Sequence, residues 1–196
     1  MPALPYTMVL ALTALWCSLY VPQGGMSEGV LLELTRLTAR TSVFFFLAAF
    51  SASALLKLTR SGAARFLVIN RRHIGLSFAL SHFIHLGALL SYFAVSGEEP
   101  GAVAIYAGGF AYLLILLMAA TSNDVSQRRL GLNWRRLHLI GSWYVWAVFL
   151  NSYLGRVLEG REPLWMFGGI TALLLSAAIL RLVIGARERL TGRALG

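Results

Sequence analysis

The sequence predicts an all-α membrane protein, a single polytopic bundle of about six transmembrane helices with both termini in the cytoplasm. Of the 196 residues, 58% are hydrophobic and only 13% are charged, whereas a soluble domain carries about a quarter charged residues. The apolar residues form continuous blocks, each close to the roughly 20 residues that a helix needs to cross about 30 Å of hydrocarbon. Because the blocks are continuous and do not alternate, they favour helices over a β-barrel.

Six blocks meet this length, at residues 4–22, 37–58, 73–95, 103–121, 136–154 and 163–186. No Lys or Arg precedes the first block and no small-residue cleavage site follows it, so we interpret it as a retained helix and not a signal peptide. The stretches 23–36, 57–72 and 122–135 are predicted to be connections. The pairs Gly108–Gly109 and Gly168–Gly169 are expected to allow close approach of neighbouring helices.

The charges predict the orientation of the bundle. If the N-terminus is cytoplasmic, the even-numbered connections and the C-terminal end carry thirteen basic and two acidic residues, and the other side carries four basic and six acidic ones. Such a Lys/Arg bias places the basic side in the cytoplasm, facing anionic lipid headgroups. The net charge of +9 is therefore explained by topology, and no nucleic-acid partner is predicted.

Known chemical motifs are few. The sequence has one cysteine, Cys17, and no HExxH, CxxC or paired-carboxylate arrangement, so hydrolytic chemistry has no support. No glycine-rich dinucleotide motif is found, and no soluble flavin or nucleotide domain is predicted beside the helices. If the protein moves electrons, a partner must deliver them.

Four histidines are the candidate site residues, because ionisable groups at membrane depth are costly and are usually functional. His73 and His138 lie near the predicted cytoplasmic ends of the third and fifth helices. His82 and His85 lie about 15–20 Å inside and on nearly one face of the third helix. At least one of this deeper pair is expected to contact a cofactor, a proton path or a polar partner.

Two stretches carry a family resemblance. The run RRHIGLSFALSHFIH (71–85) resembles the third helix of ferric reductase-like transmembrane domains, in the branch that includes the haem-binding membrane subunit of the periplasmic methionine sulfoxide reductase system. The run TSNDVSQRRLGLNWRRLH (121–138) is similar to the entry of that family into helix five. The resemblance covers about residues 37–186. It implies a haem b whose iron is bound by His85 and His138, with His82 as a substitute ligand.

One position departs from the family pattern. Asn151 stands where the family usually has a second histidine in helix five, and an amide is a poor haem ligand. Counted from the predicted cytoplasmic ends, His85 lies about 20 Å deep, Asn151 about 22 Å and His138 only about 3 Å. His73 matches the depth of His138 but points away from His85. A bis-histidine haem is therefore not secured, and a five-coordinate haem is an open alternative.

Three functions remain in view. The first is a membrane haem protein that relays electrons from a cytoplasmic redox partner or a quinol to an external acceptor. The second is a haem-free interaction subunit that keeps the fold, which Asn151 favours. The third is a quinone-binding protein using His82, His85 and Asn151. Arg181, near the end of the last block, is expected either to reach the lipid headgroups or to bind a haem propionate.

Overall fold

The computed structural model describes residues 3–190 and 192, which form helices joined by short turns, with no strand among them. The all-α prediction is confirmed for this part of the chain. In chain order the elements are α1 (Leu4–Gly24), α2 (Glu28–Thr59), α3 (Gly62–Ile69), α4 (Arg71–Ser96), the π-helical turn η1 (Ala104–Gly108), α5 (Gly109–Ala120), α6 (Asp124–Leu130), α7 (Leu132–Leu158) and α8 (Leu164–Leu190).

Helix α2 begins earlier than the sequence predicts. The stretch 23–36 is helical from Glu28 onward, so α2 has 32 residues. Glu28 lies in the first turn, where a carboxylate interacts favourably with the helix dipole. Leu31 and Leu34 are buried. Glu33 lies between them in the sequence, and Arg36 follows them. The predicted span 37–58 lies within α2, and the helix extends beyond its start because these charged residues interrupt the apolar run without interrupting the helix.

Capping residues explain the short helices α3 and α6, which lie in predicted connections. The side-chain oxygen of Ser61 accepts a hydrogen bond from the Ala64 backbone N–H at the start of α3. Asn123 does the same for Ser126 at the start of α6. Helix α4 ends at Gly97, whose φ of 69° is a left-handed conformation that glycine adopts without strain.

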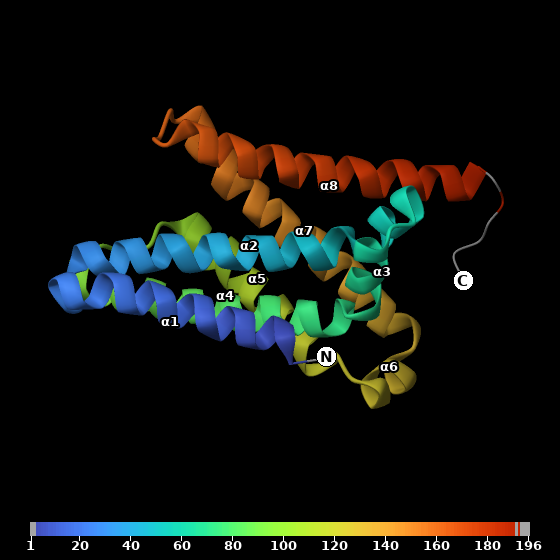
Figure 1. The fold of residues 1–196 in the computed structure, drawn as a ribbon, viewed down its shortest axis with the longest axis horizontal. Coiled ribbons are helices and arrows are strands. Elements are labelled where there is room, and N and C mark those ends of the chain that lie inside the picture. Colours follow the sequence, from blue (N-terminus) through green and yellow to red (C-terminus); the bar gives the residue numbers. More distant parts are fainter. Residues whose placement is uncertain (1–2, 191, 193–196) are drawn as a thin grey trace.

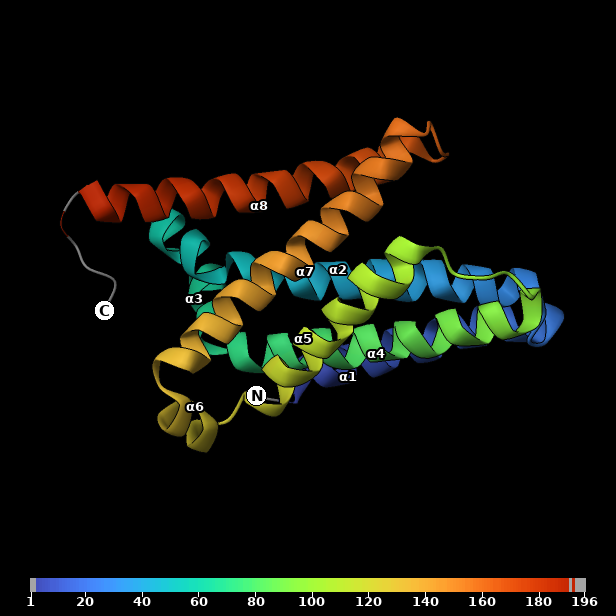
Figure 2. The ribbon, with the colours of Figure 1, turned by 180° about the vertical axis from the view of Figure 1, so that it is seen from behind.

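The long helices form an elongated bundle. Helices α1, α2 and α4 lie side by side along the long axis of the molecule (Figure 1). Helix α8 lies along the other side of α2, and α7 crosses obliquely from α6 to the start of α8 (Figure 2). We call the end of the bundle that holds the start of α1, the helices α3 and α6 and the end of α8 the terminal end, and the opposite end the far end.

Several helices are suited to a bilayer. Four stretches are long and apolar enough to cross a membrane: Leu4–Pro22, Glu28–Thr59, Arg71–Ser96 and Leu164–Leu190. The bent pair Ala104–Ala120 and Asp124–Leu130, which turns by 104°, is a fifth candidate span. Helix α7 has 27 residues, but polar ones such as His138 and Asn151 make it less apolar. The protein is thus an integral membrane protein with four or five candidate spans in the part that the structure describes.

Close helix approach occurs at Gly141. A Cβ added there would lie 2.8 Å from Met118 Sδ, so α5 and α7 meet where α7 has no side chain. A Cβ added at Gly108–Gly109 or at Gly168–Gly169 would meet nothing within 4 Å. The prediction for these two pairs is wrong, because small residues permit a close contact only where the fold brings a second helix to them.

Aromatic side chains fill the centre of the bundle and fix α4 against α2. The buried ring of Phe46 lies 5.1 Å from that of Phe50, 5.3 Å from Phe78 of α4 and 5.3 Å from Phe149 of α7. Trp143 of α7 meets Phe50 edge-on at 5.2 Å. In a bilayer such packing, together with polar contacts, drives helix association. One turn beyond Phe78 along α4 lies the histidine pair.

Candidate functional site

His85 of α4 is held by the backbone and a side chain of α2. Its Nδ1 lies 3.1 Å from the Thr35 carbonyl oxygen and 3.3 Å from Thr38 Oγ1. The Thr38 hydroxyl donates its own hydrogen to the Leu34 carbonyl at 2.7 Å, so its oxygen is an acceptor for the histidine. Both neighbours accept, and the His85 proton is therefore on Nδ1, which leaves an unprotonated lone pair on Nε2.

His82 is fixed in the same way. Its Nδ1 lies 3.0 Å from Ser42 Oγ, whose hydrogen is donated to the Ala39 carbonyl at 2.8 Å. His82 therefore also carries its proton on Nδ1 and a lone pair on Nε2. Its ring stacks on Tyr112 of α5 at 4.7 Å and meets Phe149 of α7 edge-on at 5.4 Å. His82 thus lies among aromatic rings from α5 and α7.

The two histidines form one site, and Nδ1 of each ring is turned toward α2. Their ring centroids are 5.4 Å apart. An imidazole whose Nδ1–H is bonded to a carbonyl and whose Nε2 is unprotonated is arranged as metal-ligating histidines are. His85 meets this description most closely, because its Nδ1 is bonded to a backbone carbonyl and the stacked rings surround His82.

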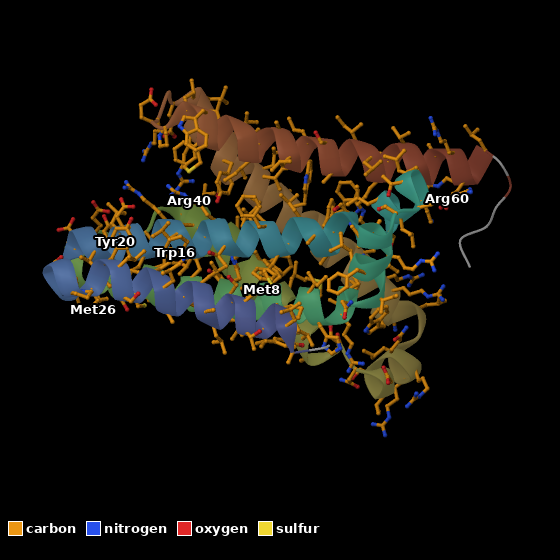
Figure 3. The ribbon with its side chains drawn as sticks, viewed as in Figure 1. Met8, Trp16, Tyr20, Met26, Arg40 and Arg60 are labelled. Carbon is orange, nitrogen blue, oxygen red and sulfur yellow. The ribbon has the colours of Figure 1, made fainter. Side chains whose placement is uncertain are left out.

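Arginines lie near this site toward the far end. Arg156 of α7 is within electrostatic range of His85, and Arg156 and Arg40 of α2 are both within range of the buried Tyr153. Figure 3 places Arg40 on the side of α2 that faces α7 and α8. The guanidinium of Arg156 donates to the Ser152 carbonyl at 2.8 Å. The charge of Arg156 makes the surroundings of His85 favourable to an anionic group.

His138 lies in a separate cluster at the terminal end. Its Nε2 lies 3.3 Å from Thr121 Oγ1 at the end of α5, and Thr121 donates its hydrogen to the Leu117 carbonyl at 2.7 Å. The His138 proton is therefore on Nε2. Trp134 stacks on the His138 ring at 4.1 Å and donates to the Thr121 carbonyl at 2.9 Å. The Thr, Trp and His of the second motif thus form one joint between α5 and α7.

His73 and Asn151 are not brought to His85 by these contacts. Nδ1 of His73 lies 3.3 Å from the Tyr6 hydroxyl of α1, on another side of α4. Asn151 is exposed on α7, and Phe149, two residues earlier, is the α7 side chain that contacts His82. His85 and Asn151, which the sequence predicts to lie at similar depth, therefore point in different directions.

The arginines of the first motif tie it to its surroundings. Arg72 forms an ion pair with Asp124 of the second motif, with 2.8 Å between Nη1 and Oδ1. Arg71 donates to the Ala49 carbonyl at 3.1 Å and to Ser53 at 3.2 Å, both on α2. The two motifs, far apart in sequence, are therefore neighbours at the terminal end.

Arg181 is partly buried against α2 and α7. Its guanidinium lies 3.9 Å from the centre of the Phe50 ring and 5.2 Å from that of Trp143, and it donates to the Phe50 carbonyl at 3.2 Å. The expectation that it reaches the lipid headgroups is not met. Cation–π contacts and the carbonyl offset the cost of placing the charge there.

The residues of α2 that hydrogen-bond to His82 and His85 were not predicted from the sequence. Thr35, Thr38 and Ser42 are buried, and Thr35 Oγ1 has no hydrogen-bond partner among the described residues. The available signal was a set of hydroxyl residues spaced three and four apart in an apolar helix, which places them on one face.

No group of three or more His, Cys, Asp or Glu side chains gathers as a metal site in the described ranges. A haem iron requires only one or two protein ligands.

Comparison with known proteins points to one kind of relative. The chain is 28% identical over 177 residues to the protein-methionine-sulfoxide reductase heme-binding subunit MsrQ of Yersinia enterocolitica, covering 87% of this chain and 86% of that protein. It is 29% and 28% identical over 161 residues to the subunits of the same name from Salmonella arizonae and Salmonella paratyphi B, covering 72% of this chain and 77% of each of them. No family model matches the chain, and no solved structure is similar to it. The resemblance predicted from the two motifs is confirmed by these relatives.

Proposed function

We propose that this chain, a relative of the haem-binding subunits of protein-methionine-sulfoxide reductases, is itself a membrane haem-binding subunit of such a reductase. In this role it relays electrons across the inner membrane to an acceptor outside, and His85 binds the haem iron. The observation that carries the proposal is the Thr35 carbonyl on His85 Nδ1, which keeps Nε2 unprotonated.

The surroundings of His85 fit a haem. The Thr38 hydroxyl and the Thr35 carbonyl orient the ring, and Arg156 supplies positive charge for the carboxylates that a haem carries. The chemistry that a haem supplies when bound is one-electron exchange at its iron. Because Cys17 is the sole cysteine, a C-x-x-C-H attachment is impossible in this chain, which supports a noncovalent haem b.

The second axial position is the weak part of a bis-histidine arrangement. Position 151 is an asparagine, and His138 uses Nε2 to bind Thr121 at the terminal end. We therefore propose a haem with one histidine ligand from this chain. That ligand is His85, with His82 as the alternative. An unfilled position favours binding of a small ligand or of a partner's side chain.

We further propose six spans, with α7 as the span that its polar residues obscure, and both termini in the cytoplasm. The terminal end carries most of the basic residues, which agrees with the Lys/Arg rule for cytoplasmic connections. We propose that the electrons come from a separate donor. A quinol or a redox protein meets this need.

A haem spectrum tests the proposal. Purified from haem-replete cells, the wild type is expected to show a Soret band, which His85→Ala removes or reduces by more than half. His138→Ala is the matched control: it is expected to keep the band and to lower the thermal midpoint, because it opens the joint with Thr121 and Trp134. Loss of the band in His138→Ala alone would transfer the ligand role to His138.

The haem-free interaction subunit remains the second candidate, and Asn151 is the observation that favours it. A wild type with no Soret band after reconstitution with added haem would support it. Saturable quenching of the tryptophan fluorescence of that haem-free protein by an added quinol, abolished in His82→Ala, would instead favour quinone binding.

A further inference from the structure

A basic cavity lies at the terminal end, away from the histidines. It has a volume of about 630 Å³ and is bounded by the end of α2, by α3 and by the last turns of α8. Its lining residues are Leu56, Lys57, Arg60, Arg65, Ile184, Arg187 and Glu188. Figure 3 places Arg60 where α3 approaches the C-terminal half of α8. Four basic residues and one acidic residue therefore face one space.

Internal pairing leaves this lining strongly positive. Lys57 Nζ and Glu188 Oε1 form an ion pair at 2.5 Å, which engages the single carboxylate of the lining. The side chains of Arg60 and Arg65 have no hydrogen bond or ion pair among the described residues. Basic residues in a last helical turn commonly serve the helix dipole, which accounts for Lys57. Arg60 and Arg65 lie beyond the end of α2 and are not explained in this way.

The cavity is also amphipathic. Leu56 and Ile184 contribute an apolar wall, and both belong to stretches suited to crossing the membrane. A ligand that fits presents a phosphate to the arginines and hydrocarbon to the leucine and isoleucine. Basic pockets between transmembrane helices on the cytoplasmic side bind anionic lipid headgroups for this reason.

We propose that this cavity, which we call the α2–α3–α8 pocket, binds the phosphate headgroup of an anionic phospholipid. Arg60 and Arg65 contact the phosphate by charge-assisted hydrogen bonds, and the acyl chains lie against Leu56 and Ile184. A bound lipid would link α8 to α2 and α3 at the terminal end. The site is independent of haem, so it can fail without the proposed function failing, and the reverse also holds.

The backbone at Arg60 provides a variant that should still fold. Arg60 ends α2 with a φ of 52°, in the left-handed region that glycine adopts more readily than arginine. Arg60→Gly therefore removes the cation while it relaxes the turn. Combined with Arg65→Ala, it deletes two charges from the pocket. The control is Arg128→Ala/Arg129→Ala on α6, which deletes two exposed charges at the same end outside the pocket.

Native mass spectrometry of the detergent-purified protein measures the bound lipid. With phosphatidylglycerol added, the wild type and the α6 control are expected to retain one lipid, and the Arg60→Gly/Arg65→Ala variant about tenfold less. With phosphatidylcholine, no such difference is expected. Equal retention in the two double variants, or equal retention of the two lipids, would overturn the site.

A separate arm distinguishes the source of the phosphate. Inorganic phosphate at millimolar concentration is expected to leave the thermal midpoint and the bound lipid of the wild type unchanged. If phosphate instead displaces the lipid and raises the midpoint in wild type but not in the pocket variant, the ligand is a soluble phosphate compound and the lipid assignment is wrong.

Discussion

At the scale of single residues, the proton position of each histidine separates the candidate ligands. His82 and His85 receive acceptors from α2 and keep Nε2 unprotonated, whereas His138 donates from Nε2 to Thr121. Recruiting Nε2 of His138 to iron would break that bond and release the ring from Trp134. The sequence pattern groups these histidines together, but their hydrogen bonds give them different chemistry.

Thr38→Val tests the support of His85 without changing the size of the side chain. The variant removes the Thr38 hydroxyl 3.3 Å from Nδ1, while the Thr35 carbonyl stays in place. Loss of an outer hydrogen bond to a ligating histidine costs about 10–100-fold in affinity, and because one acceptor remains we expect about tenfold. Titration of the apo-protein with haem, followed at the Soret band, measures it.

Thr41→Val is the matched control for this titration. Its hydroxyl lies 3.4 Å from Trp16 Nε1 of α1 and serves a different contact on the same helix. Haem affinity should be unchanged in this variant. Weaker binding in Thr41→Val together with normal binding in Thr38→Val would remove Thr38 from the site.

At the scale of elements, the crossing of α5 and α7 is set by Gly141. Replacing it with alanine would bring a methyl group to 2.8 Å from Met118 Sδ. Overpacking costs typically 1–3 kcal/mol, and because a methionine side chain adapts we expect about 1 kcal/mol. The thermal midpoint in detergent should fall for Gly141→Ala and recover in the double variant Gly141→Ala/Met118→Ala.

Gly108→Ala is the comparison for that crossing, since a Cβ there meets nothing within 4 Å. Its midpoint should stay at the wild-type value or rise slightly, because alanine favours helix over glycine. A larger loss for Gly108→Ala than for Gly141→Ala would contradict the packing described for α5 and α7.

Helix existence was predictable from the sequence, and helix boundaries were less so. Blocks of apolar residues identify the long helices because the bilayer requires about 20 residues in any sequence context. The start of α2 at Glu28 and the short helix α6 depend on local capping and on burial of single leucines, which hydropathy does not resolve. The depth of His82 and His85 in the membrane stays a prediction from counting residues. The α2 acceptors depend on helix rotation, which the sequence alone leaves undetermined.

At the scale of the whole molecule, the pictures and the charges describe one orientation. The start of α1 and the end of α8 both point toward the end of the bundle that holds α3 and α6, and this terminal end is the basic one (Figure 1). In the topology proposed from the Lys/Arg rule, this end is cytoplasmic and the far end is outside. In that proposal, electrons leave the protein at the far end, nearer to His85 than to His138.

Single cysteines in a Cys17→Ala background test this orientation. Glu99→Cys and Arg161→Cys lie at the far end, and Gln127→Cys and Arg129→Cys lie on α6 at the terminal end; all four positions are exposed. A membrane-impermeant maleimide added to intact cells is expected to label the first two, and to label the second two only after lysis. The cysteine-free parent reports background. Labelling of the α6 positions in intact cells would invert the topology.

The contact between Arg181 and Phe50 joins residues 131 positions apart, from the last helix back to the second. Arg181 is therefore synthesised long after Phe50, and also after Trp143, the other ring that lies beside Phe50. This contact between α8 and α2 can close only once α8 has been made.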